Sequence, residues 1–199
     1  MNNLRKNLHQ CIARIVARAR GFTLIETFVA ITILITAIVA PLAIAAEGLY
    51  SALIASDQTT ALFLAQDGIE YVRWVRDTND LSGNNWLAGL ANCGSTDGSK
   101  TCYFDSTISP YQSGNVTQCS GTCPYISYDT STGFYNYNPP TSSNAPTKFI
   151  RTVSITLPVC VSGGSACNQS EASVLSTVSW QDGKLPHTFT VREDLFQWQ

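Results

Sequence analysis

The longest uniform pattern in the chain is an apolar run near its N-terminus. Residues 22–46 carry one charged side chain, Glu26, and from Thr27 onward the run has none. An α-helix of this length extends about 37 Å, which is enough to cross the hydrocarbon core of a bilayer. The pattern therefore predicts a transmembrane helix over residues 22–46.

The same helix is predicted to continue beyond the apolar run. From residue 47 to about residue 80, apolar side chains recur at three- and four-residue steps with polar ones between them, which is typical of an amphipathic helix. The turn formers of TNDLSGNN at 78–85 mark its end near Thr78. Pro41 lies inside the helix and lacks a backbone N–H, so we expect a bend or a melted turn there.

Alternating patterns follow in the C-terminal third. FIRTVSITL at 149–157 alternates apolar and hydroxyl side chains with the period of a half-buried strand. VLSTVSWQDGKLPHTFTV at 174–191 predicts two strands around an Asp182-Gly183 turn. Together these segments predict an antiparallel sheet of three or more strands, whose apolar face the amphipathic helix would cover. The expected fold class is α+β.

The region between helix and sheet has a different composition. Residues 82–147 are rich in Gly, Ser, Thr, Asn and Tyr, and we expect loops with a few short strands. Tyrosines are concentrated at 125–138. They either pack locally or form a contact surface, and local packing is the commoner role of tyrosines in a disulfide-stapled domain.

Charge is distributed unevenly along the chain. Five of the 12 basic residues precede Phe22 and no acidic residue does, whereas all 14 acidic residues follow it. Basic residues before a membrane helix favour a cytoplasmic N-terminus, which places the rest of the chain outside the cytoplasm. The acidic remainder argues against non-specific binding of nucleic acid.

The cysteines agree with export. Cys11 lies in the basic leader, and the other six lie beyond the apolar run, where an exported domain would form disulfides. Six cysteines allow 15 connectivities, and pairs of sequence neighbours would close only short loops. CSGTC at 119–123 has no second half for a zinc site. The disulfide candidates are Cys93, Cys102, Cys119, Cys123, Cys160 and Cys167.

No catalytic constellation emerges from the sequence. His187 is the only histidine beyond the leader, and its strand position predicts a partly buried structural side chain. Nucleophile, zinc-protease and nucleotide-binding motifs are missing. Asp182, Glu193 and Asp194 near the C-terminus could form a calcium site, but acids beside a hairpin turn are usually solvated, which is the simpler interpretation. We expect neither an enzyme nor a cofactor or metal.

The residues at the start of the apolar run carry a family resemblance. RGFTLIE at 20–26, followed by an unbroken apolar helix, resembles the prepilin signature of type IV pilins and of type II secretion pseudopilins. The resemblance implies that a prepilin peptidase cuts between Gly21 and Phe22 and methylates the new amino group. It also implies a pilin-like fold, with a leader at 1–21, an anchor at 22–46, an amphipathic helix at 47–80 and an exported domain at 81–199.

Each residue of the signature suits this role. Gly21 has no side chain to obstruct a peptidase cleft. Glu26 follows Phe22 by one helical turn, so its carboxylate is expected to pair with the cationic N-terminus of a neighbouring subunit in a filament core. The implied partners are the peptidase, other pilin or pseudopilin subunits and the inner-membrane assembly platform. The implied role is that of a minor pilin or pseudopilin, held in the inner membrane before assembly.

Three alternatives stay open at this point. Ala43-Ile44-Ala45 before Ala46 matches the small-residue cleavage pattern of a secretory signal peptide, and cleavage there would release a soluble disulfide-rich domain. Glu26 is incidental if the helix is an ordinary signal anchor. The tyrosine-rich segment 125–138 would make the outer domain a tip adhesin if it contacts a ligand.

Overall fold

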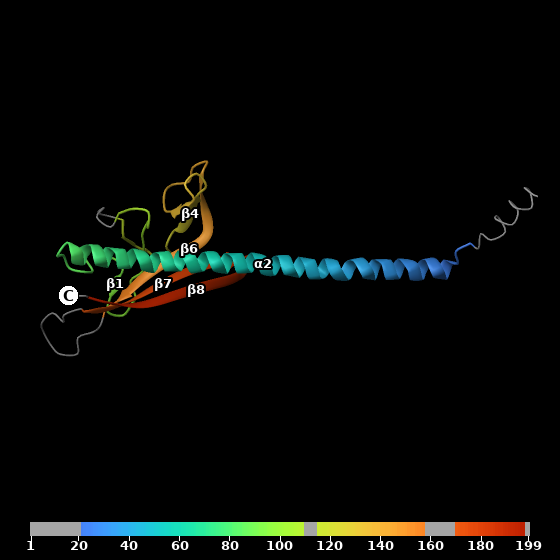
Figure 1. The fold of residues 1–199 in the computed structure, drawn as a ribbon, viewed down its shortest axis with the longest axis horizontal. Coiled ribbons are helices and arrows are strands. Elements are labelled where there is room, and N and C mark those ends of the chain that lie inside the picture. Colours follow the sequence, from blue (N-terminus) through green and yellow to red (C-terminus); the bar gives the residue numbers. More distant parts are fainter. Residues whose placement is uncertain (1–20, 110–114, 158–169, 198–199) are drawn as a thin grey trace, which may run out of the picture. The chain divides into compact units, whose positions relative to one another are not determined.

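The computed structural model describes residues 21–109, 115–157 and 170–197. It divides into two compact units, residues 1–53 and 54–199. One helix, α2 (Leu24–Leu81), begins in the first unit and ends in the second (Figure 1). The sequence prediction of one long helix ending near Thr78 is therefore confirmed to within three residues at that end.

The residues after Leu81 explain how α2 terminates. The N–H of Ser82 donates to the carbonyl oxygens of Thr78 and Asn79, and that of Asn84 donates to Asn79, so the last carbonyls of the helix keep partners. Gly83, between them, has a φ of 70°, a left-handed conformation that favours glycine. The chain then turns into the loops of the second unit.

Pro41 does not interrupt the helix. The helical assignment of α2 is continuous from Leu24 to Leu81 and includes Pro41, so the structure contains no melted turn at that residue. One missing backbone donor is tolerated because the hydrogen bonds of the neighbouring turns keep the chain helical. A bend at Pro41 stays a prediction.

The second unit contains an eight-stranded, mostly antiparallel sheet. Strand β6 is its hub, since it pairs with β1, β2, β4 and β7, while β8 pairs with β7 over twelve residue pairs. The strands are β1 (Gly94–Ser95), β2 (Cys102–Tyr103), β3 (Thr117–Gln118), β4 (Tyr125–Asp129), β5 (Phe134–Asn136), β6 (Asn144–Thr156), β7 (Glu171–Asp182) and β8 (Leu185–Phe196).

The three predicted strands correspond to β6, β7 and β8. β6 begins five residues earlier than the pattern indicated, because its first half pairs with β4 and includes Pro146. The hairpin turn between β7 and β8 lies one residue later than the predicted Asp182-Gly183 turn: it consists of Gly183 and Lys184 and is closed by the pair Asp182 and Leu185. Gly183 has a φ of 62°, which accounts for glycine at this tight turn.

The core lies between the sheet and the part of α2 in the second unit, which crosses β6, β7 and β8 (Figure 1). Alternate residues of β6 and β7 face the helix and are buried, as half-buried strands require. The predicted cover of the sheet by the amphipathic helix is therefore confirmed. The helix residues in the two core clusters are Ala61, Leu64, Ala65, Ile69, Tyr71, Val72 and Val75.

The middle region follows the prediction of loops with short strands. β1, β2 and β3 have two residues each, and several tyrosines pack on one another, as Tyr128 does on Tyr135 with ring centres 5.0 Å apart. Disulfides join Cys93 to Cys102 and Cys119 to Cys123, which are two of the possible short-loop pairs. Cys160 and Cys167 lie outside the described residues.

Candidate functional site

The predicted processing site lies just before α2. Gly21 and Phe22 precede the helix, Phe22 is 74% exposed, and no atom lies near the position of a Cβ on Gly21. Both residues are exposed, so the bond between them is accessible within the described part of the chain. Residues 1–20 of the predicted leader lie outside the described residues.

Thr23 caps the N-terminus of α2. Its hydroxyl oxygen accepts a hydrogen bond from the N–H of Glu26 at 3.3 Å, and its carbonyl accepts from Glu26 and Thr27. Thr23 to Glu26 thus matches the capping-box spacing, in which a glutamate three residues after the cap supports the helix start. In a complete capping box the Glu26 carboxylate would also accept a hydrogen bond from the backbone N–H of Thr23. That bond is not formed, and the carboxylate is exposed without a partner among the described residues.

The capping spacing was missed by the sequence prediction, which assigned Glu26 only to subunit pairing. The signal was present as TLIE, a threonine followed three residues later by glutamate at the start of an apolar helix. The spacing therefore suggests a capping role for the Glu26 side chain, to be tested against the assembly role, although the carboxylate makes no capping bond in the structure. The two differ in whether the charge of the side chain is needed.

Every side chain from residue 21 to residue 53 is exposed. The segment is long and apolar enough to cross a membrane. Its threonine hydroxyls bond back to the helix, Thr27 to Leu24 O at 2.8 Å and Thr32 to Val29 O at 2.8 Å. These hydroxyls therefore need no water, which suits a helix with apolar surroundings.

The second unit holds its part of α2 through a buried cation. Arg151 on β6 is 2% exposed, and its Nη1 donates to the Asp67 carboxylate and to Leu64 O at 3.3 Å, both on α2. Nη2 donates to Phe104 O at 2.9 Å, and the guanidinium carbon lies 5.0 Å from the centre of the Phe104 ring. One side chain therefore links the helix, the hub strand and the segment after β2.

Gly68 allows the close approach of α2 to the sheet beside this cation. A Cβ at position 68 would stand 2.5 Å from Ser176 Oγ and 3.3 Å from Arg151 Cδ. Such distances require the neighbours to move, and Ser176 is fully buried on β7. The glycine is therefore required by packing rather than by backbone conformation.

Two ion-pair groups lie at the ends of this contact. Lys148 Nζ donates to Asp57 at 2.5 Å on α2 and to Asp182 at 2.6 Å on β7. Hydrogen bonding by Lys148 is the largest cause that lowers the pKa of Asp182. At the other end, Arg73 bonds both oxygens of Glu193 at 2.6 Å, which raises the pKa of Arg73.

The acids considered for calcium do not come together. Asp182 ends β7 and binds Lys148, whereas Glu193 binds Arg73 and Asp194 contacts Arg192 near the other end of β8. Eight residues of extended strand, about 26 Å, separate Leu185 beside the turn from Glu193. The calcium alternative is therefore wrong for these three residues, and no group of three metal-binding side chains occurs among the described residues.

His187 is a partly buried sheet residue, as predicted. Its ring stacks on Trp180 with centres 5.3 Å apart, and its Nε2 lies 3.6 Å from the Asp182 carboxylate.

No protein-family model, curated protein or solved structure matches this chain. The site therefore has to be interpreted from its own residues.

Proposed function

We propose that the chain is a prepilin-like subunit, anchored in a membrane by the first part of α2 and assembled through that helix after removal of its leader. The observation that supports this most directly is the exposed apolar segment 24–46, whose one carboxylate, Glu26, lies near its start. A surface of this kind requires an apolar environment, first lipid and then the helices of neighbouring subunits.

The accessible Gly21-Phe22 bond supports processing at the membrane surface. The bond precedes the helix cap, so a peptidase can reach it without unwinding α2. Cleavage there keeps the whole apolar segment in the mature protein and frees an amino group at Phe22. The freed group carries the positive charge, methylated or not, that Glu26 of another subunit would neutralise.

The first experiment determines the N-terminus. The full chain is produced with and without a prepilin peptidase, and its intact mass and N-terminal sequence are measured. We expect a chain starting at Phe22 with one added methyl group only when the peptidase is present. A soluble chain starting at Ala46 would contradict the proposal and indicate a secreted domain.

The second experiment separates the two roles of Glu26. Glu26→Gln keeps an oxygen for the capping box and removes the charge, whereas Glu26→Ala removes both. Both variants should be cleaved normally, and both should be missing from sheared filaments if the charge pairs between subunits. If Glu26→Gln enters filaments like the wild type and only Glu26→Ala fails, the side chain acts as a cap and the pairing is refuted.

A further inference from the structure

The two halves of strand β6 pair with different strands, so the sheet divides along β6. Residues 150–156 of β6 pair with β7, whereas residues 144–150 pair with β4. β7 continues to Asp182, beyond Ser179, its last residue paired with β6. β6 and β7 therefore diverge at Ile150. A trough of about 620 Å³ opens there, between β4 on one side and β7 on the other, within the second unit. This volume is in the range of small-molecule sites.

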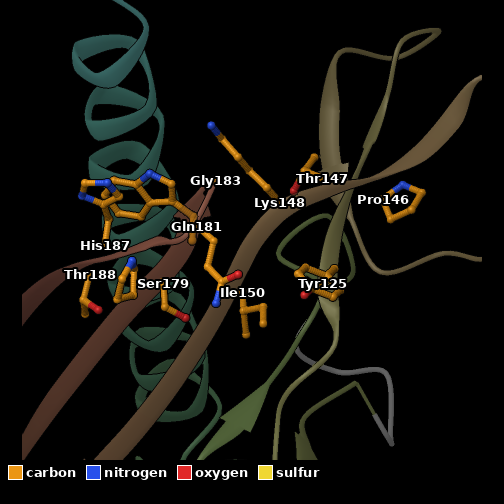
Figure 2. A pocket seen from close by; sticks show the side chains of 12 residues that line it. Tyr125, Pro146, Thr147, Lys148, Ile150, Ser179, Gln181, Gly183, His187 and Thr188 are labelled. Atoms are coloured by element: carbon orange, nitrogen blue, oxygen red, sulfur yellow. The ribbon is translucent and has the colours of Figure 1, made fainter. Parts of the chain in front are cut away.

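The walls of the trough carry neutral hydrogen-bonding side chains. Tyr125 of β4 lies on one side, Ser179 and Gln181 of β7 lie on the other, and Ile150 lies between them (Figure 2). Thr188 of β8 extends the second wall. Within the described part of the chain none of the side chains of Tyr125, Ser179, Gln181 and Thr188 makes a hydrogen bond. Their bonding capacity is therefore available to a ligand.

The trough has no uncompensated cation. Lys148 lines it with its aliphatic stem, but its ammonium group points toward α2 in Figure 2 and is bound there by Asp57 and Asp182. His187 is stacked on Trp180. A charged ligand would find no partner of opposite charge among the lining residues, so the chemistry favours a neutral one.

The backbone of the trough is poor in free donors. Pro146 and Pro186, on its two sides, have no N–H, and the N–H of Phe149 donates to Thr147 Oγ1 at 3.2 Å. A peptide that added to the sheet as a strand would need a ladder of such donors. Recognition therefore has to use side chains.

We propose that this trough binds a neutral oligosaccharide. Hydroxyls of Tyr125, Ser179 and Thr188 and the amide of Gln181 can each donate and accept, as sugar hydroxyls do. The ring of Tyr125, 56% exposed as a residue, offers an apolar face for the C–H side of a pyranose. The inference does not depend on whether α2 assembles into a filament.

The test uses the full chain in lipid nanodiscs, because glycoside detergents would compete. Maltotriose, cellotriose and chitotriose serve as neutral probes, and a proline-rich decapeptide serves as the alternative. Binding is measured by saturation-transfer NMR and calorimetry. We expect at least one trisaccharide to bind to the wild type. Tyr125→Ala should raise the dissociation constant of that trisaccharide by about tenfold or more.

Two further variants make the test specific. Gln181→Ala should weaken binding of the trisaccharide severalfold, because it removes the side-chain amide. Tyr128→Ala, on the same strand but outside the trough, should bind like the wild type. No binding by the wild type to any trisaccharide, equal binding by Tyr125→Ala, or binding of the peptide alone would overturn the proposal. Self-association abolished by Tyr125→Ala, without sugar binding, would indicate a second copy as the occupant.

Discussion

Two stretches of α2 use their apolar residues differently. In residues 24–53 every side chain is exposed, including Ile33, Leu34 and Ile38. In residues 54–81 one face is buried against the sheet and its apolar side chains complete two core clusters. Both stretches are helical throughout, so secondary structure does not distinguish them.

The difference lies in how polar residues are spaced. From residue 57 onward, charged side chains such as Asp57, Asp67 and Arg73 interrupt the apolar positions and form ion pairs with residues of β6 and β8. The first stretch has no such residues between Glu26 and Glu47. An apolar stripe needs one neighbouring surface, whereas a helix that is apolar all round needs an apolar environment on every side.

The sharpest test of this comparison places one charge in each stretch. Ala65→Asp buries a carboxylate in the core, where Ala65 is fully covered, and should destabilise the second unit by about 4 kcal/mol or more. Ala37→Asp should leave unfolding unchanged and reduce membrane retention, since aspartate at a helix centre costs about 3 kcal/mol in a bilayer. Unfolding is followed by tryptophan fluorescence in denaturant, and retention by fractionation. Equal effects of both changes on unfolding would break the comparison.

A second test removes the cation that holds the buried stretch. Arg151→Ala leaves Asp67 and two carbonyl oxygens without their donor and should lower the free energy of unfolding by about 3 kcal/mol. Arg192→Ala is the control, because Arg192 is exposed and its guanidinium forms its ion pair, within the described part of the chain, with Asp194. Denaturant midpoints of the full chain in detergent are compared. An Arg151 variant as stable as the control would show that apolar packing alone holds the helix.

A third test concerns the closest approach of helix and sheet. Gly68→Ala should lower the free energy of unfolding of the second unit by about 1 to 2 kcal/mol, because the clash with Ser176 exceeds the gain in helix propensity. Adding Ser176→Ala should restore most of the loss, since it removes the hydroxyl that a Cβ would meet. Gly48→Ala, in open space, should not destabilise. Thermal melts of the four proteins provide the measurement, and a lack of rescue would locate the strain elsewhere.

The smallest expected effect depends on pH. The pKa of Asp182 is lowered, chiefly by hydrogen bonding from Lys148, so its contribution to stability is present above the ordinary aspartate value of about 3.9 and is lost as the pH falls through the lower folded value. Asp57 shares the ammonium and His187 lies 3.6 Å from Asp182. Asp182→Asn should therefore be less stable than wild type at pH 6, with the gap closing below pH 4. A stability difference between the two proteins that does not change with pH would contradict the lowered pKa of Asp182.

Sequence periodicity was sufficient for the helix, the three long strands and the covered face of the sheet. These elements depend on local alternation, which FIRTVSITL at 149–157 and the residues around Gly183 display openly. The role of Arg151 was not predicted, because its strand position indicates burial but not the partners Asp67 and Phe104, which are distant in sequence. The fork at Ile150 was missed for the same reason.

The candidate sites were predicted to different degrees. Gly21, Phe22 and Glu26 follow from a contiguous motif, and the structure adds the Thr23 cap to it. The trough between β4 and β7 has no sequence signature, because Tyr125, Gln181 and Thr188 come from three strands that are brought together only by the pairing of β4 and β7 with β6 and of β8 with β7. Separate segments of a chain reveal such a site only after the sheet topology is known.

The central position of β6 also sets the order in which this protein can fold. Among the strands that the structure describes, those before residue 144 can pair only as β2 with β3 and β4 with β5 until β6 is synthesised. The remaining pairings, and the cover for the apolar face of α2, wait for β6 and β7. A nascent chain therefore exposes that face until late in synthesis, and such non-local pairing is slow. Chains truncated before Asn144 should be the ones most prone to aggregate.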